Sequence, residues 1–383
     1  MIDSFTELRK LAEKDGHIIY DLFFGPNHPG MHGNFGYVLD MVGSEIIKVR
    51  LNAGQLHRGF EKLMENRTWL QNFSLIPRVC VVDPDPNEVA YAQAAEKIAG
   101  IEIPERAKYL RTITLEMSRI TSLLMGMGAV GGATGLYTIM YWMFADRDLM
   151  LDMFEWLAGA RIYHIYNVIG GVRRDLPEGF IEKLLEVLNY YENRLPEYDH
   201  LLYNNPVIVK RLKGIGKVSA EDAKKWGLTG PNLRASGVKS DVRKDFPYAA
   251  YDKIDFEVPM QENAAGDALA RAIQVRLEFE ESIKIIRKAV AQIPEGDVHL
   301  KIGNALKITI PPGEAYSKVE SSKGEFGYYV VSNGGLNPYR VSVRGPSLPA
   351  GLFVCHKHLP GMRIDDVALW LGTFAVCPPD FDK

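Results

Sequence analysis

The order of hydrophobic and polar positions predicts β-rich ends around a helical middle. Near the N-terminus, short β-branched and aromatic runs flank a Gly/Pro/His loop at 25–33, which is the punctuation of strands and hairpins. The predicted strands there are His17–Tyr20, Gly36–Leu39 and Ile46–Val49. From about residue 59 apolar residues recur at helical spacing, as in Phe60, Leu63 and Met64. Long helices are predicted over Val89–Ala99, Arg106–Met125, Leu149–Val168, Gly179–Arg194 and Asp267–Gln292.

Strand patterns return after this helical region. Gly327–Val331 and Tyr339–Val343 bracket Asn333-Gly334-Gly335, a hairpin signal, and a last helix is predicted from about Ile364. The fold class is therefore α+β, with a central bundle of long helices and a β lobe formed by the N-terminal and C-terminal segments. The expected division is 1–58 (β-rich lobe), 59–300 (helical bundle, with an irregular insertion at about 205–262), 301–350 (β-hairpin lobe) and 351–383 (terminal helix and cavity tail).

One stretch, Ile120–Ala145, carries no charged residue and is long enough to cross a bilayer. It contains five glycines and is bounded by Arg119 and Asp146. These features favour a helix that is buried on all sides within the bundle, with methionines that fill the core. Contact with a membrane is then expected through partner chains.

Composition narrows the class of protein. The 383 residues are 46% hydrophobic with a net charge of -3, so a large core is expected, and scattered Lys and Arg residues exclude a nucleic-acid-binding surface. Three cysteines do not form an evenly paired disulfide framework, and Met1–Ser4 does not begin a charged-then-apolar leader. A reducing cytoplasm is the expected compartment.

Two segments near opposite ends share a C-x-x-D pattern, Cys80–Asp83 and Cys377–Asp380. A C-x-x-C pair at each place would supply four thiolates to a soft-metal centre. The repeated loss of the second cysteine suggests an inherited metal site that has been emptied of its metal. Two alternatives stay open, namely chance strings containing core cysteines, and zinc or a single iron held by two thiolates and two carboxylates.

The chain resembles the large catalytic subunit that group 4 [NiFe]-hydrogenases and respiratory complex I share. The motifs that carry the resemblance, in order, are Gly25–Pro29, Leu56–Lys62, Asn167–Asp175, Gly227–Pro231, Lys323–Gly327 and Tyr339–Arg344. The resemblance spans nearly the whole chain and implies a [NiFe]-hydrogenase large-subunit-like fold. The positions of the metal-bridging cysteines of the hydrogenases are occupied here by Asp83 and Asp380. The position of a hydrogenase glutamate that transfers protons is occupied by Gly33. A hard carboxylate is a poor bridge for nickel and iron, so hydrogen activation is not expected.

The quinone-reducing branch of the family places a histidine and a tyrosine around the quinone head group. The loop histidines match His28 and His32, but the tyrosine position is Val81. A histidine close to the iron-sulfur cluster falls on Tyr163, with His164 next to it. The resemblance therefore supports a quinone site only in part.

The pattern is most similar to a third branch, the membrane-bound sulfane-sulfur reductases of anaerobic archaea, whose large subunit has lost the nickel-iron site. That resemblance implies an oxidoreductase subunit of a ferredoxin-dependent, cation-translocating complex. Such a complex reduces polysulfide or an organic trisulfide. The reaction takes place beside the proximal [4Fe-4S] cluster of an adjacent small subunit. No cofactor or metal is expected on this chain. The alternatives are a quinone-reducing subunit like that of complex I and a non-catalytic scaffold.

The same resemblance implies the partners and the location. The expected partners are an iron-sulfur small subunit, a ferredoxin-type cluster subunit, membrane antiporter-like and anchor subunits, and soluble ferredoxin as electron donor. The chain would lie peripherally on the cytoplasmic face of the cell membrane.

Candidate roles follow from sulfur chemistry. Cys80 and Cys377 are expected to contact substrate sulfur, because thiolates attack disulfide-like bonds. Asp83 and Asp380 are expected to pass protons, with pKa values raised by burial near each other. The residues expected along the substrate or proton path are His28, His32, Arg78, Arg173 and Arg174. The two histidines alternatively orient their own loop, the last two arginines are alternatively surface charges, and Arg58 is expected next to the partner's cluster.

Overall fold

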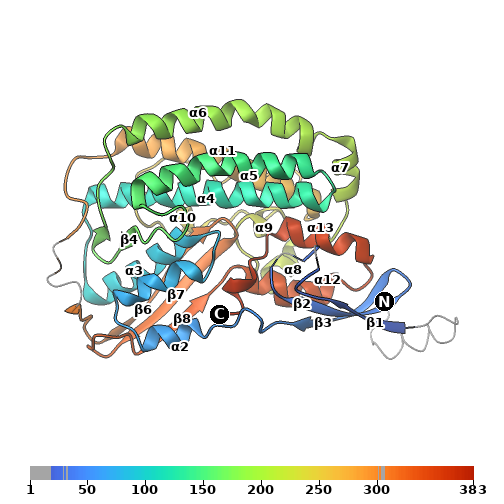
Figure 1. The fold of residues 1–383 in the computed structure, drawn as a ribbon, viewed down its shortest axis with the longest axis horizontal. Helices are drawn as coiled ribbons and strands as arrows, with labels where there is room; N and C mark the ends of the chain where they lie inside the picture. Colours follow the sequence, from blue (N-terminus) through green and yellow to red (C-terminus); the bar gives the residue numbers. More distant parts are fainter. Residues whose placement is uncertain (1–18, 29, 32, 301, 303–306) are drawn as a thin grey trace.

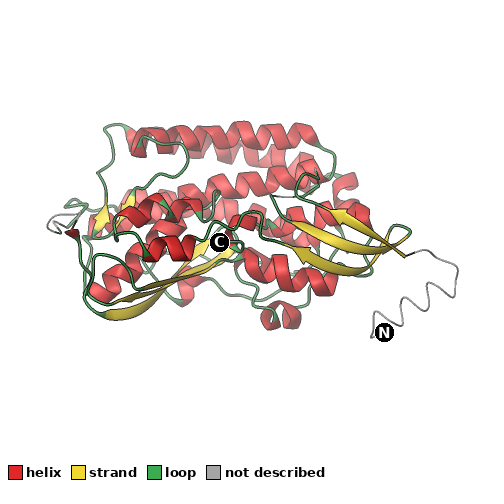
Figure 2. Ribbon diagram, turned by 60° about the horizontal axis from the view of Figure 1, so that its bottom comes forward, coloured by secondary structure: helices red, strands yellow, loops and turns green. Residues whose placement is uncertain are grey.

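The computed structural model describes residues 19–28, 30–31, 33–300, 302 and 307–383. Four long helices lie side by side above two small sheets (Figure 1). They are α4 (Glu105–Ala133), α5 (Tyr137–Ala158), α6 (Phe180–Tyr198) and α11 (Ala268–Gln292). The two three-stranded sheets lie on one side of the bundle with the C-terminus between them, as Figure 2 shows. The α+β prediction is confirmed.

All the predicted long helices are present, but some of their ends differ, since α4 continues to Ala133 and α5 begins at Tyr137. The prediction for Leu149–Val168 is wrong beyond Ala158, because Gly159 adopts a left-handed φ of 79° and its N–H bonds to the Glu155 carbonyl, which ends α5. The following residues form a loop that leads to the two-residue strands β4 (Asn167–Val168) and β5 (Gly171–Val172).

The charge-free stretch forms two helices and not one buried helix. It spans the end of α4 and the start of α5, and the chain turns between them at Gly135, whose φ is 85°. Tyr137 and Tyr141 on α5 are 57% and 65% exposed, so the expectation of burial on all sides is wrong. Across the part of the chain that the structure describes, no helix has the length and apolarity needed to cross a bilayer.

The N-terminal sheet packs against the C-terminal helices. It consists of β1 (Ile19–Phe24), β2 (Gly36–Val42) and β3 (Glu45–Asn52), all antiparallel. The predicted strand at 17–20 overlaps β1, and its first two residues lie outside the described residues. One core contains Phe35 and Tyr37 from this sheet side together with Trp370 and Phe374 of α13 (Ile364–Phe374). The two chain ends therefore meet, through the packing of α13 and through an antiparallel backbone bridge between Glu45 of β3 and Arg363.

The second sheet contains β6 (Gly313–Ser321), β7 (Gly324–Ser332) and β8 (Arg340–Arg344). The predicted β7–β8 hairpin is confirmed, with Val331 opposite Arg340. Helix α3 (Pro84–Ala99) packs on this sheet, where the Tyr328 hydroxyl donates to Asn87 Oδ1 at 2.9 Å. Shorter helices complete the chain: α2 (Phe60–Glu65), α7 (Pro206–Leu212), α8 (Ala220–Lys225), α9 (Gly230–Arg234), α10 (Val242–Asp245) and α12 (Cys355–His358). Four of them, α7 to α10, occupy the stretch predicted to be irregular.

A buried network of charges fixes the sheet to the bundle. Glu278 of α11 accepts from Arg119 of α4 and from Arg234 of α9, the second at 2.6 Å. Arg234 also pairs with Glu320 of β6 at 2.9 Å, and Arg119 donates to the Ser321 carbonyl at 2.7 Å. All five residues are buried. These charge pairs hold the end of β6 in place. Removing one partner of a pair would leave an uncompensated charge buried in the protein, which is strongly destabilising.

Glu278→Ala is expected to lower the free energy of unfolding by roughly 3–5 kcal/mol, because two buried guanidinium groups lose their shared carboxylate. Urea unfolding measures the change. The matched control on the same helix is Glu280→Ala, whose partly exposed pairs with Arg276 and Lys284 are expected to be worth less than about 1 kcal/mol. Equal losses in the two variants would contradict a stabilising role for the network.

Candidate functional site

The two C-x-x-D segments adopt the same local turn. The backbone N–H of Asp83 donates to the Cys80 carbonyl at 3.3 Å, and that of Asp380 donates to the Cys377 carbonyl at 3.1 Å. The turns face each other, so the two Sγ atoms lie 3.4 Å apart. Both cysteines are buried free thiols. Burial, and then the neighbouring Cys377, raises the pKa of the Cys80 thiol well above its usual value.

Asp83 forms a buried ion pair. Its Oδ2 atom lies 2.7 Å from Lys323 Nζ and accepts from Ser322 Oγ at 2.7 Å. Lys323 also donates to Ser122 Oγ at 3.1 Å. Burial by itself would lower the pKa of Lys323, but Asp83, together with Cys80 and Cys377, outweighs burial and raises it. The lysine is therefore a fixed positive charge beside the two thiols.

Asp380 has a different environment. Its carboxylate accepts from Ser347 Oγ at 2.6 Å and from the Ser347 N–H at 3.2 Å. Burial raises the pKa of Asp380 to about 7, although Ser347 and Lys323 oppose the shift. The predicted rise in pKa through burial is thus found for the Asp380 carboxyl. This group can gain or lose a proton near neutral pH.

Sequence reasoning did not single out Lys323 or the serines around the site. Lys323 occupies the two-residue turn between Ser321 of β6 and Gly324 of β7. Gly324 has a φ of 131°, and a Cβ there would collide with Thr229 Oγ1, so only glycine fits this turn. A lysine in a hairpin turn is usually solvated, so only the motif that contains it could have drawn attention to it.

A cavity of about 710 Å³ opens beside the site. Cys377, Pro378 and Lys323 line it, together with Gly33 and Val81. Residues from α4 and α5 also line it: Met125, Gly126, Ala129, Gly132, Ala133, Tyr137, Met140 and Phe144. The expectation that the methionines only fill the core is therefore wrong for Met125 and Met140.

The predicted arginines Arg58 and Arg78 lie together near the cysteine pair. Arg58 donates to the Arg78 carbonyl at 2.9 Å, and the Arg78 guanidinium lies 4.6 Å from the ring centre of Tyr163. Arg58 is exposed and Arg78 is half-buried. His164, next to Tyr163, is buried, and its Nδ1 lies 2.8 Å from Asp85 Oδ2.

The remaining predicted site residues lie elsewhere. His28 lines a separate pocket of about 250 Å³, and its Nδ1 accepts from the Gly30 N–H at 3.1 Å, which orients its own loop. His32 lies outside the described residues. Arg173 and Arg174 are exposed and do not line the cavity, and Arg173 donates to the Ala158 carbonyl.

The donor set does not fit a nickel-iron centre. One of the two bridging positions, Asp83, is occupied by its pair with Lys323, which adds a positive charge where a metal would need a negative ligand. A smaller set remains, since ligand atoms of Cys80, Cys377 and Asp380 lie within 4.8 Å of one another. These three could hold a single soft ion such as zinc or iron.

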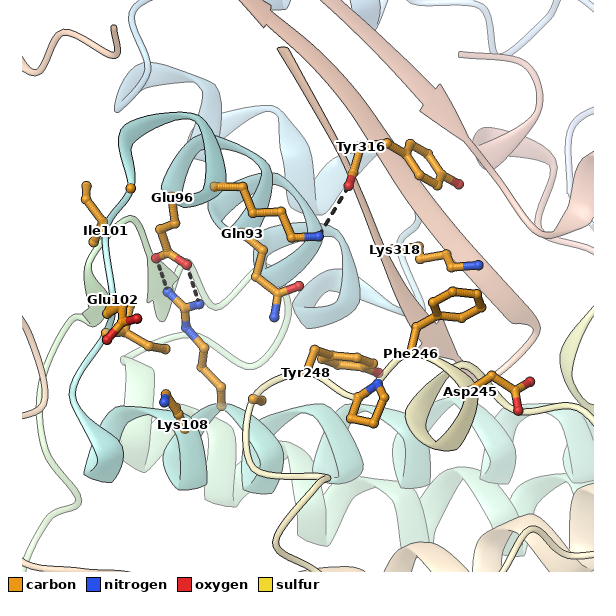
Figure 3. Close-up of a pocket in the computed structure, with 16 residues that line it drawn as sticks. Gln93, Glu96, Ile101, Glu102, Lys108, Asp245, Phe246, Tyr248, Tyr316 and Lys318 are labelled. Carbon is orange, nitrogen blue, oxygen red and sulfur yellow. Dashed lines mark hydrogen bonds and ion pairs between the residues drawn. The ribbon is translucent and has the colours of Figure 1, made fainter. Parts of the chain in front are cut away.

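A larger pocket, of about 1050 Å³, contains none of the C-x-x-D residues (Figure 3). It lies between the end of α3, the start of α4, the loop at 245–249 and β6. Its buried charges are paired, with Arg111 Nη2 lying 2.6 Å from Glu96 Oε1. The chemistry is therefore concentrated in the smaller cavity.

Known proteins resemble the chain over nearly its full length. Residues 133–383 match the family described as respiratory-chain NADH dehydrogenase, 49 Kd subunit. The chain is 51% identical to a subunit of the NADH-quinone oxidoreductase of Thermosipho melanesiensis, over 94% of this chain and 99% of that protein. It is 37% identical to a subunit of the F(420)H(2) dehydrogenase of Methanosarcina mazei, over 98% of this chain and all of that protein.

One solved structure has the same fold and a related sequence. It is that of the membrane-bound sulfane sulfur reductase (MBS), an archaeal respiratory membrane complex. A chain in it matches this one with a TM-score of 0.91 and 43% sequence identity, covering 95% of this chain and 98% of that chain.

Asp380→Asn is expected to flatten part of the pH dependence of stability. A carboxyl whose pKa is raised from 3.8 to about 7 binds its proton more tightly in the folded state. Its contribution therefore falls as pH rises through this window, by up to about 1.4 kcal/mol per pH unit, and then levels off. Urea unfolding at a series of pH values measures the difference between the variant and the wild type. The exposed Asp365→Asn control should keep the wild-type slope, and an equal slope in Asp380→Asn would contradict the assignment.

Proposed function

This chain belongs to the respiratory-chain NADH dehydrogenase 49 Kd subunit family, and we propose that it is the large subunit of a membrane-bound, ferredoxin-dependent complex that reduces sulfane sulfur. The substrate would be polysulfide or an organic trisulfide. It would react in the 710 Å³ cavity beside the proximal [4Fe-4S] cluster of a partner subunit, and the complex would couple this reaction to cation translocation.

The paired sulfurs carry this proposal. Cys377 lines a cavity that is large enough for a short sulfur chain with organic ends, and its Sγ atom lies 3.4 Å from that of Cys80. Thiols form mixed disulfides with such chains by thiol–disulfide exchange. The 43% identity to a chain of a sulfane sulfur reductase supports the same chemistry.

Proton delivery is the second requirement, because each cleaved S–S bond releases two sulfur anions. Asp380, with a pKa of about 7, is suited to supply a proton and to be reloaded at neutral pH. Lys323 would stabilise negative charge that develops on sulfur, since its ammonium is fixed by Asp83. Asp83 would then act as a positioning residue for Lys323.

Electrons would arrive from the side of the arginine pair. Arg58 is exposed and donates to the carbonyl of Arg78, which lies just before Cys80 in the sequence. We assign this surface to the iron-sulfur small subunit, with the cluster subunit and soluble ferredoxin further along the electron path. Antiporter-like and anchor subunits would hold the chain on the cytoplasmic face of the membrane.

Quinone reduction is the second candidate, and two observations favour it. The chain is 51% identical to a subunit of the NADH-quinone oxidoreductase of Thermosipho melanesiensis, and the cavity is lined mostly by apolar residues. Against it, Val81 occupies the tyrosine position and His28 lies in a separate pocket. A purely structural role is the third candidate.

We expect the purified complex to oxidise reduced ferredoxin with an organic trisulfide faster than with a quinone. Product thiol, quinol and hydrogen, measured side by side, distinguish the three activities. A higher rate with quinone would favour the second candidate. Hydrogen evolution, or nickel found by elemental analysis of the complex, would contradict the proposal.

Cys80→Ser and Cys377→Ser are each expected to lower trisulfide turnover at least about tenfold, a loss of roughly 1.4 kcal/mol of transition-state stabilisation. Cys355→Ala is the matched control, because the Cys355 thiol donates to the Gly351 and Leu352 carbonyls away from the pair. If both serine variants assemble and turn over at the wild-type rate, the two thiols take no part in the reaction. If variants of Asp83 also keep the wild-type rate, the purely structural role is favoured. Elemental analysis that finds one zinc ion per chain, or one iron ion per chain in excess of the iron in the partner clusters, would favour a metal bound by Cys80 and Cys377.

A further inference from the structure

We propose that Cys80 and Cys377 form a dithiol–disulfide relay in which Cys377 attacks the substrate and Cys80 resolves the resulting mixed disulfide. The inference rests on the proposed function, which it extends by assigning a separate chemical role to each thiol. It is carried by the distance between the sulfurs and by the different access that the two thiols have to the cavity.

Access distinguishes the two cysteines. Cys377 lines the cavity and is 8% exposed, whereas Cys80 does not line it and is fully buried. A sulfur compound in the cavity therefore meets Cys377 first. Cys80 lies directly behind, with its Sγ atom 3.4 Å from that of Cys377.

The distance suits a resolving step. A disulfide bond is about 2.05 Å long, so closure requires the sulfurs to approach by roughly 1.4 Å. Each cysteine adjoins a short 3-10 turn, at Ile76–Arg78 and at Pro378–Asp380, and neither lies within a long helix. Small shifts of these turns could bring the sulfurs together, whereas two cysteines held within rigid helices would resist such a change.

The chemistry balances in three steps. The Cys377 thiol attacks an outer sulfur of a trisulfide, R–S–S–S–R, and the bond to the next sulfur breaks. The leaving persulfide, R–S–S–H, takes the thiol proton, and Cys377 keeps the S–R group as a mixed disulfide. Cys80 then attacks Cys377 Sγ, R–SH leaves with the second thiol proton, and a Cys80–Cys377 disulfide forms. Two electrons and two protons from the iron-sulfur donor restore both thiols.

The third cysteine provides an internal control. Cys355 donates its thiol hydrogen to the carbonyls of its own helical turn, at 3.0 Å each. It is thus a buried thiol of the same chain without a sulfur neighbour among its contacts. A burst of product that persists in Cys355→Ala does not come from Cys355.

The test is a single turnover without an electron donor. The intact complex is treated with a phosphine to reduce thiols while its clusters stay oxidised, the phosphine is removed, and dimethyl trisulfide is added. Acid quenching, alkylation and peptide mass mapping then follow each cysteine. Wild type and Cys355→Ala are expected to release one thiol and one persulfide per chain and to contain a Cys80–Cys377 cross-link.

The variants test the order of attack. Cys80→Ser is expected to release persulfide only and to retain a methylthio adduct on Cys377, whereas Cys377→Ser should give neither product nor adduct. An adduct on Cys80, a full burst from Cys80→Ser, or a cross-link formed with diamide but not with trisulfide would overturn the relay. If steady-state trisulfide reduction proceeds without any cross-link, the relay is wrong and the proposed function stands. If the complex reduces quinone and no trisulfide, the proposed function itself is wrong.

Discussion

The buried pair between Lys323 and Asp83 is the interaction around which the site is organised. An ammonium in the protein interior is costly unless a carboxylate and further acceptors compensate it, and here Asp83 at 2.7 Å and two serine hydroxyls do so. The pair also explains why this cavity is unsuited to two metal ions, since the lysine supplies the positive charge. The hairpin turn that carries Lys323 must be held firmly, and the charged network at the end of β6 holds it through Arg119 and the Ser321 carbonyl.

The site is assembled from segments that are far apart in the chain. The Cys80 turn precedes α3, Lys323 joins two strands, and Cys377 follows α13. Hydrogen bonds fix the C-terminal tail: Asp382 accepts from the backbone N–H groups of Gly54 and Leu56, each at 2.8 Å, and Ser347 Oγ accepts from the Cys377 N–H at 2.9 Å. Without these contacts the second thiol would not face the first. The C-terminal tail therefore positions Cys377 opposite Cys80.

The cavity results from the way the charge-free stretch folds. Glycines and alanines on α4 leave room where larger side chains would fill the bundle, and the turn at Gly135 directs α5 back along α4. A continuous apolar helix would have offered no such space. The same residues that suggest a membrane segment in the sequence thus line one side of the cavity.

Most element types could be predicted from the order of residues alone, because periodicities of two and of 3.6 residues are local properties of strands and helices. The paired C-x-x-D turns and the family were equally predictable, since they depend on residue identity and order. The folded chain was needed to learn that Lys323 joins Asp83, that Met125 and Met140 line the cavity, and that Arg173 and Arg174 face solvent. Burial, pKa shifts and the 3.4 Å approach of two sulfurs arise from contacts between distant segments, which no local pattern of residues encodes.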